Sequence, residues 1–156
     1  MWSDNQKEFF YWIGGLNYTL DELKHGVLRG NRKKPGAILK LLKSNDPKAE
    51  FVSEESYDQR ILFLCLDLPQ VMEHIEYFDN PDTMDNKLNT YLREYFNVKV
   101  EVDTINEELL MPDIFQTYGS DFGSKEVILE FISKYFDNSE YDIQEVGKSL
   151  SIKFMN

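Results

Sequence analysis

Apolar and polar positions change their period several times along the chain, which indicates short helices mixed with short strands. Continuous apolar runs over 8–13 and 60–66 predict two buried strands. Strict alternation over 98–103 and 150–154 predicts two half-exposed strands. Helical spacing predicts helices over 20–28, 37–43, 84–96, 112–118 and a longer one after Ser124. The pattern predicts an α+β fold: one mixed domain over 1–156, with several short helices packed on a small sheet whose strand order is open.

The first predicted helix carries its own start and stop signals. Thr19 and Glu22 have the spacing of a capping box, in which each side chain bonds the other residue's free amide. The Arg29-Gly30 pair suits the C-terminal end, where glycine and a cation are favoured. Gly26 weakens the helix interior by about 1 kcal/mol relative to alanine, so we expect close packing at that position.

Length and composition favour a globular chain without a membrane span. The 156 residues contain no apolar run of the roughly 18 residues that a spanning helix needs. Residues 2–8 are polar, so the start of the chain has no signal-peptide pattern. Cys65 is the single cysteine, which excludes an intrachain disulfide and suits a reducing compartment. We therefore expect a cytoplasmic protein.

Charge is distributed unevenly along the chain, whose net charge is −11. Residues 1–50 hold nine Lys or Arg against six Asp or Glu, whereas residues 51–156 hold eight against twenty-two. The acidic majority predicts that the protein does not bind nucleic acid. The basic loop 29–34 is either a solvated surface or the contact for an acidic protein partner.

The helix over 20–28 also carries candidate chemistry. Asp21, His25 and Arg29 follow one another at intervals of four and so share one helix face. A carboxylate in this position can fix the tautomer of an imidazole that acts as a general base, although charged helix faces show the same spacing. Together with Asn31 and Arg32, the residues His25 and Arg29 are the candidate binding residues.

The sequence supports a nucleophile or a metal site less well than it supports the candidate base His25. Cys65 lies between leucines and a phenylalanine, and burial there would raise its pKa and leave it inert. It is a catalytic candidate only if it faces His25. His74 has acidic neighbours but no second histidine or cysteine nearby, so we predict no metal and no cofactor.

Four segments resemble the family catalogued as domain of unknown function 547. Residues 13–32 contain Ile-Gly-Gly, Thr-Leu-Asp-Glu-Leu and Lys-His-Gly-Val-Leu-Arg-Gly, which are similar to the signature of that family. Residues 58–63 resemble its D-P-R-I-x-F strand, and residues 84–96 stand in the place of the helix that follows. Residues 114–122 resemble its I-F-x-x-Y-x-x-D-F motif. The resemblance spans roughly residues 9–155.

The chain departs from the family pattern in three places. The cysteines of the family's N-C-G-x-x-S-C-P turn align with Asp67 and Met72. The family's leading F-W-I-N-x-Y-N helix and its closing Y-D-W-S-L-N motif have no counterpart. The resemblance therefore implies a domain that is incomplete at both ends and lacks the thiol turn.

Two functions follow from these features. The favoured one is a non-catalytic binding or scaffold module of this intracellular family, which contacts an acidic partner through the loop 29–34. The alternative is a papain-like thiol- or histidine-dependent hydrolase, an analogy in which His25 is the base and Asp21 its orienter. Cys65 or a residue of 67–72 would then face the imidazole. The oligomeric state stays open.

Overall fold

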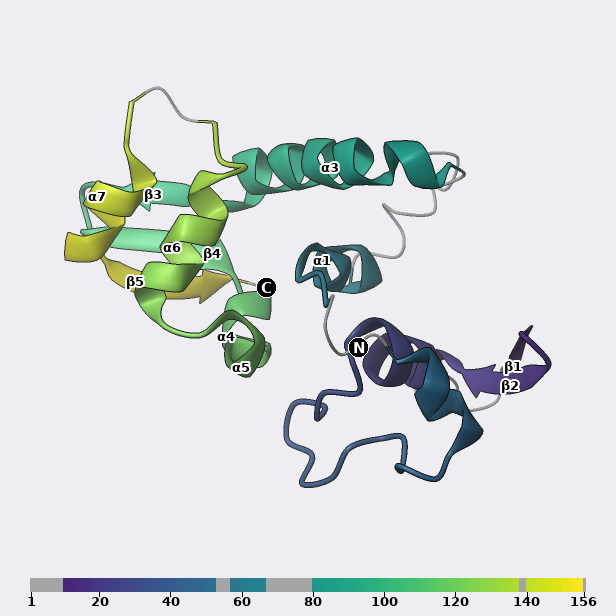
Figure 1. Ribbon diagram of the computed structural model, residues 1–156. Helices are drawn as coiled ribbons and strands as arrows, with labels where there is room; N and C mark the ends of the chain where they lie inside the picture. The colour runs from purple at the N-terminus through teal and green to yellow at the C-terminus, as the bar shows by residue number, and fades with distance from the viewer. Residues whose placement is uncertain (1–9, 53–56, 67–79, 138–139, 156) are drawn as a thin grey trace. The chain divides into compact units, whose positions relative to one another are not determined.

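The computed structural model describes residues 10–52, 57–66, 80–137 and 140–155 (Figure 1). The chain divides into two compact units, Met1–Leu66 and Asp67–Asn156, which are described separately below. Their helices, with one sheet of two strands and one of three, confirm the predicted α+β class. The assignment of 1–156 to one domain stays a prediction. No helix in the described ranges is long and apolar enough to cross a membrane.

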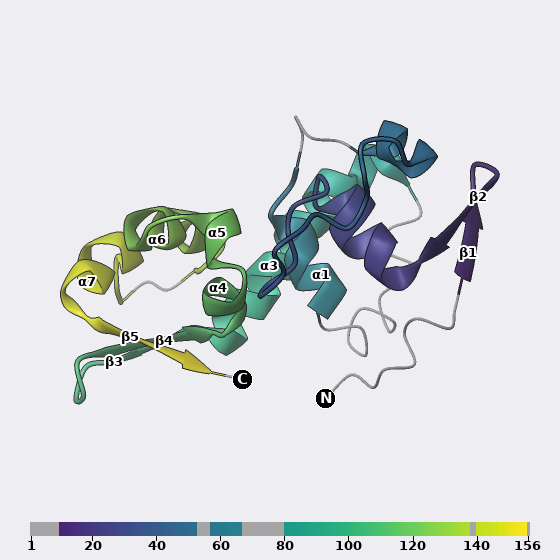
Figure 2. The ribbon, with the colours of Figure 1, turned by 90° about the horizontal axis from the view of Figure 1, so that it is seen from below.

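The first unit opens with a β-hairpin of β1 (Phe10–Ile13) and β2 (Leu16–Thr19), paired antiparallel. Gly14 and Gly15 form its turn with φ of 59° and 79°, a left-handed backbone that glycine adopts without strain. All four residues of β1 are exposed, so the predicted strand exists but is not buried. In the described residues the hairpin forms a sheet of two strands (Figure 2).

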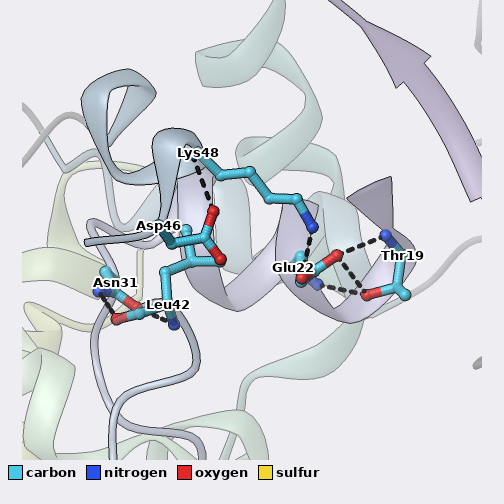
Figure 3. A network of polar contacts seen from close by, with 6 residues as sticks. All are labelled: Thr19, Glu22, Asn31, Leu42, Asp46 and Lys48. Atoms are coloured by element: carbon cyan, nitrogen blue, oxygen red, sulfur yellow. Dashed lines mark hydrogen bonds and ion pairs between the residues drawn. The ribbon is translucent and has the colours of Figure 1, made fainter. Parts of the chain in front are cut away.

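The predicted helix follows directly, and its wide turns form a π-helix, η2 (Glu22–Leu28), after Leu20 and Asp21. The capping box is confirmed: the Thr19 amide donates to Glu22 Oε2 at 2.8 Å, and the Glu22 amide donates to Thr19 Oγ1 at 3.1 Å (Figure 3). Gly26 packs closely, as expected, because a Cβ there would lie 2.9 Å from the Leu42 side chain.

Two predicted elements of the first unit are wrong. Residues 37–43 form an irregular loop instead of a helix, and a short 3-10 helix, η3 (Pro47–Phe51), follows it. Residues 60–66 form the helix α1 (Arg60–Leu66) instead of a strand. The Asp58 side chain accepts from the Arg60 amide at 3.0 Å and so supports the helix start. A short apolar run fits a buried helix as well as a buried strand, and no β-branched stretch favoured the strand here.

The first described element of the second unit is the 3-10 turn η5 (Pro81–Thr83), which Asn80 caps and which continues into α3 (Met84–Lys99). The predicted helix is confirmed, and its buried stripe consists of Leu88, Leu92 and Phe96. It runs to Lys99, so the strand predicted over 98–103 is shorter than expected.

Three strands form the sheet of the second unit: β3 (Glu101–Asp103), β4 (Glu108–Pro112) and β5 (Ser151–Met155). Their order is β3-β4-β5, with β3 antiparallel and β5 parallel to β4. The strand predicted over 150–154 is confirmed. The parallel pairing places the end of the chain beside β4, which no local pattern indicated.

Four further helices follow in the described part of this unit: α4 (Ile114–Thr117), α5 (Gly119–Phe122), α6 (Lys125–Ser133) and α7 (Ile143–Ser149). The helices α5, α6 and α7 lie on one side of the three-stranded sheet (Figure 2). An aromatic cluster fills the core beneath them, with ring centroids 4.7–6.4 Å apart among Phe96, Phe115, Phe122 and Phe131. Val127, on the outer side of α6, is exposed.

Packing of α7 on α6 leaves no room for a side chain at Gly147, where a Cβ would lie 2.6 Å from Leu129. We expect Gly147→Ala to lower the free energy of unfolding by about 1–3 kcal/mol, because buried Leu129 must shift. Gly119→Ala is the matched control, because nothing lies within 4 Å of its Cβ position. Urea denaturation followed by circular dichroism measures both variants. An equal change in the free energy of unfolding in both variants would contradict the close packing of Gly147 on Leu129.

Candidate functional site

The candidate residues of the first unit meet around η2, where His25 and Arg29 form a buried pair. Arg29 Nη1 lies 2.8 Å from His25 Nδ1, and the two residues are 1% and 4% exposed, respectively. A guanidinium group can only donate, so Nδ1 must accept and the imidazole proton must sit on Nε2. His25 is therefore a neutral acceptor for Arg29, and its basic nitrogen is already occupied.

Electrostatics around His25 favour the same neutral form. Burial lowers the pKa of His25 to about 4, and the positive charges of Lys24, Arg29 and Lys34 act in the same direction. Among the described residues, Asp21 opposes them, with a weaker effect than theirs. The ring therefore carries no charge at neutral pH.

Asp21 does not orient the imidazole. Its carboxylate forms an ion pair with the ammonium group of Lys34, thirteen residues further along the chain. No hydrogen bond joins Asp21 to His25, although both residues lie in the described part of the chain. The structure thus brings together the three residues of the predicted face, but not in the order that a base and its orienter require.

Arg29 has a structural role at the start of the following loop. Its second guanidinium nitrogen, Nη2, donates to the backbone carbonyl of Lys33 at 3.3 Å. A buried charge is costly unless it is hydrogen-bonded, so Arg29 holds the chain close to η2. Arg29 was predicted to contact a ligand; at 1% exposure it instead supports the loop from inside.

Asn31 fastens the same loop at both ends. Its Nδ2 donates to the Leu42 carbonyl at 2.8 Å, and the Leu42 amide donates to its Oδ1 at 3.0 Å (Figure 3). Asn31 has a φ of 51°, a left-handed conformation that asparagine tolerates better than most residues. Asn31 is buried and Leu42 packs on Gly26, so this pair ties the loop to η2. Its predicted binding role is therefore indirect.

We call residues 32–43 the cationic loop. This segment follows Asn31 directly and contains Leu42. Arg32 and Lys33 are exposed at its start, and every residue from Pro35 to Leu41 is exposed. The Arg32 guanidinium lies 4.8 Å from the centroid of the Tyr57 ring, a cation–π distance. The loop contains five Lys or Arg, and no Asp or Glu occurs between Glu22 and Asp46. Such a surface attracts carboxylates.

Cys65 lies at the end of the α1 run and is half-buried, where complete burial was expected. Burial raises the pKa of its thiol, as predicted, and the charge of nearby Lys24 counteracts this only in part. Lys24 Nζ donates to the Cys65 carbonyl at 3.3 Å, and no hydrogen bond joins the sulfur to His25. A thiol with a raised pKa is a poor nucleophile at neutral pH.

Sequence reasoning missed the contacts of Lys24, Lys34 and Leu42, which complete this cluster, although Lys34 lies in the predicted contact 29–34. Lys24 is linked to Cys65 across forty-one residues, and Lys34 to Asp21 across thirteen. The spacing of hydrophobic residues does not predict such pairs, because they form only where distant segments of the chain meet in the fold.

No group of three His, Cys, Asp or Glu in the described ranges is arranged to hold a metal ion. His74 and the aligned turn positions 67–72 lie outside the described residues. A separate groove of about 410 Å³ lies in the second unit, and its lining combines carboxylates with apolar side chains. It contains none of the residues predicted from sequence.

Comparisons with protein-family models, curated proteins and solved structures found no match to this chain. The resemblance to the domain of unknown function 547 family therefore stays a prediction from the motifs. Function has to be inferred from the geometry itself.

The Asn31–Leu42 anchor can be tested with Asn31→Gly, which keeps the left-handed backbone and removes only the side chain. Loss of both hydrogen bonds leaves the Leu42 amide and carbonyl without these partners, so we expect the free energy of unfolding to fall by about 2–3 kcal/mol. Amide hydrogen exchange at Leu42 should accelerate in the variant. Unchanged protection at Leu42 would contradict the anchor.

The buried His25–Arg29 pair predicts a pH dependence of stability. The pKa of His25 is about 4 in the folded chain and 6.5 in the unfolded chain, so only the unfolded chain takes up this proton between those values. Its contribution to stability is complete above pH 6.5 and declines by about 3 kcal/mol as the pH falls to 4. His25→Asn keeps a neutral acceptor and removes the titration.

The measurement is the difference in unfolding free energy between the wild type and His25→Asn, determined by urea denaturation across this pH window. Carboxylates titrate in both proteins and cancel in the difference. The advantage of the wild type should shrink as the pH falls from neutral. A difference that does not depend on pH would show that His25 titrates normally in the fold.

Proposed function

We propose that the chain is a non-catalytic binding module that holds an acidic protein partner through the cationic loop. The observation that carries the proposal is the anchored loop itself: the Asn31–Leu42 bonds hold it next to η2, and five cations lie on residues 32–43, of which Lys34 is paired with Asp21. Fixed ends reduce the entropy that the loop loses on binding. The proposed contact starts at residue 32 and not at residue 29, because Arg29 and Asn31 are buried. It continues to residue 43 and is therefore longer than the predicted contact 29–34.

The state of the cluster around η2 supports a non-catalytic role. A hydrolase of the papain-like kind needs an imidazole nitrogen free to take a proton and a thiol that ionises easily. Here His25 Nδ1 accepts from Arg29, and burial raises the pKa of Cys65. These features favour structural roles for both residues.

The charge of the whole chain supports a protein partner over nucleic acid. With a net charge of −11, the molecule repels a polyanion at long range, whereas a short acidic segment can meet the cationic loop locally. A cytoplasmic location and a relationship to the domain of unknown function 547 family are part of this proposal. The single cysteine supports the first, and the quoted motifs support the second.

The test uses a fluorescent peptide in which glutamates alternate with serine and glycine. We expect the full chain to bind it at low ionic strength, and we expect Lys33→Glu/Lys43→Glu to weaken binding about tenfold, because two attractive contacts become repulsive. Fluorescence anisotropy measures the dissociation constant. Added salt should weaken binding by the wild type.

Arg93→Glu/Lys134→Glu is the matched control, since it changes the net charge equally at two exposed cations outside the loop. This control should retain nearly all of the affinity for the peptide. Equal losses in both variants would mean that only net charge matters. No binding by the wild type would refute the proposal.

A further inference from the structure

The cationic loop exposes large apolar side chains between its charged ends. Ile38 is 84% exposed and Leu39 is 79% exposed, and they lie between Lys34 and Lys40 in sequence. Isolated apolar residues on a surface are common, but adjacent ones on a segment where every residue from 35 to 41 is exposed are typical of an interaction site.

The backbone around these two residues explains why they do not fold inward. The Ala37 amide donates to the Lys34 carbonyl at 2.9 Å and closes a turn at Pro35-Gly36. Asn31 accepts from the amide of Leu42, which a helix over 37–43 would have used, and donates to the Leu42 carbonyl. The side chain of Leu42 is buried, so the loop is attached to the unit by Leu42 while Ile38 and Leu39 remain outside.

We infer that the segment bound by the cationic loop is amphipathic: it brings carboxylates to the lysines and arginine, and large apolar side chains to Ile38 and Leu39. This inference rests on the proposed function and adds the chemical class of the partner. A purely acidic partner would neutralise the cations and leave both aliphatic side chains in water. An acidic segment that carries leucine or phenylalanine covers both kinds of surface.

Charge complementarity selects a protein segment over a lipid surface. An anionic bilayer also offers negative charge and an apolar interior. Residues 51–156 carry fourteen more acidic than basic residues, however, and a bilayer would repel them over its whole area. A peptide places its carboxylates only where the loop places its cations.

The experiment compares two fluorescent peptides with the same glutamates, one spaced by serine and glycine and the other by leucine. We expect the full chain to bind the leucine peptide at least about tenfold more tightly, because binding removes Ile38 and Leu39 from water. The variant Ile38→Ser/Leu39→Ser should lose this preference and keep its affinity for the serine–glycine peptide. High salt should reduce the affinity for the leucine peptide less than the affinity for the serine–glycine peptide.

Val98→Ser/Ile105→Ser is the matched control, since both residues are exposed aliphatics outside the loop, at 80% and 90%. It should retain the preference for leucine. Equal affinity of the wild type for the two peptides would overturn the amphipathic partner and leave the proposed function standing. Failure to bind either peptide would overturn both.

Two further measurements test the occupant of the loop. Analytical ultracentrifugation asks whether the chain self-associates, and we expect a monomer whose mass is the same in Ile38→Ser/Leu39→Ser. Self-association that this variant abolishes would assign the loop to a second copy and overturn the inference. Sedimentation with phosphatidylserine vesicles should recover no protein at physiological salt. Vesicle binding that depends on Ile38 and Leu39 would also overturn it.

Discussion

The two hydrogen bonds between the Asn31 side chain and the Leu42 backbone decide the character of the first unit. They close a loop that has no helix or strand of its own and tie it to η2, where Leu42 packs on Gly26. Since the Leu42 amide would donate within a helix over 37–43, the bond that it makes to Asn31 also keeps the loop irregular. Its cations and aliphatic side chains are exposed as a consequence.

The residues that cluster around η2 support the loop and are not arranged for catalysis. Burying Arg29 requires an acceptor, and His25 supplies one only in its neutral form. Burial, together with the surrounding positive charges, lowers the pKa of His25 to about 4, and Asp21, whose carboxylate is paired with Lys34, raises it only weakly. Each of these contacts lowers the capacity of His25 to act as a base and strengthens the support of the loop above it.

In the second unit, the spacing of apolar residues along the chain predicted individual elements correctly. The helix α3 and the strand β5 both appear where the spacing placed them. The sheet order β3-β4-β5 did not follow from spacing, because the parallel pairing of β4 with β5 joins segments about forty residues apart. Pairing across such distances depends on the shared core, of which the aromatic cluster is a part.

Sequence alone determined the features whose causes lie within a few residues: the Thr19–Glu22 capping box, the close packing expected at Gly26, the helix α3 and the single cationic stretch. The tertiary structure decided whether 60–66 became helix or strand, since either conformation buries the same apolar run. It also decided that Arg29 and Asn31 lie inside while Arg32 and Ile38 lie outside. Burial and long-range hydrogen bonds depend on what the folded chain brings together, and the spacing of residues along it does not contain that information.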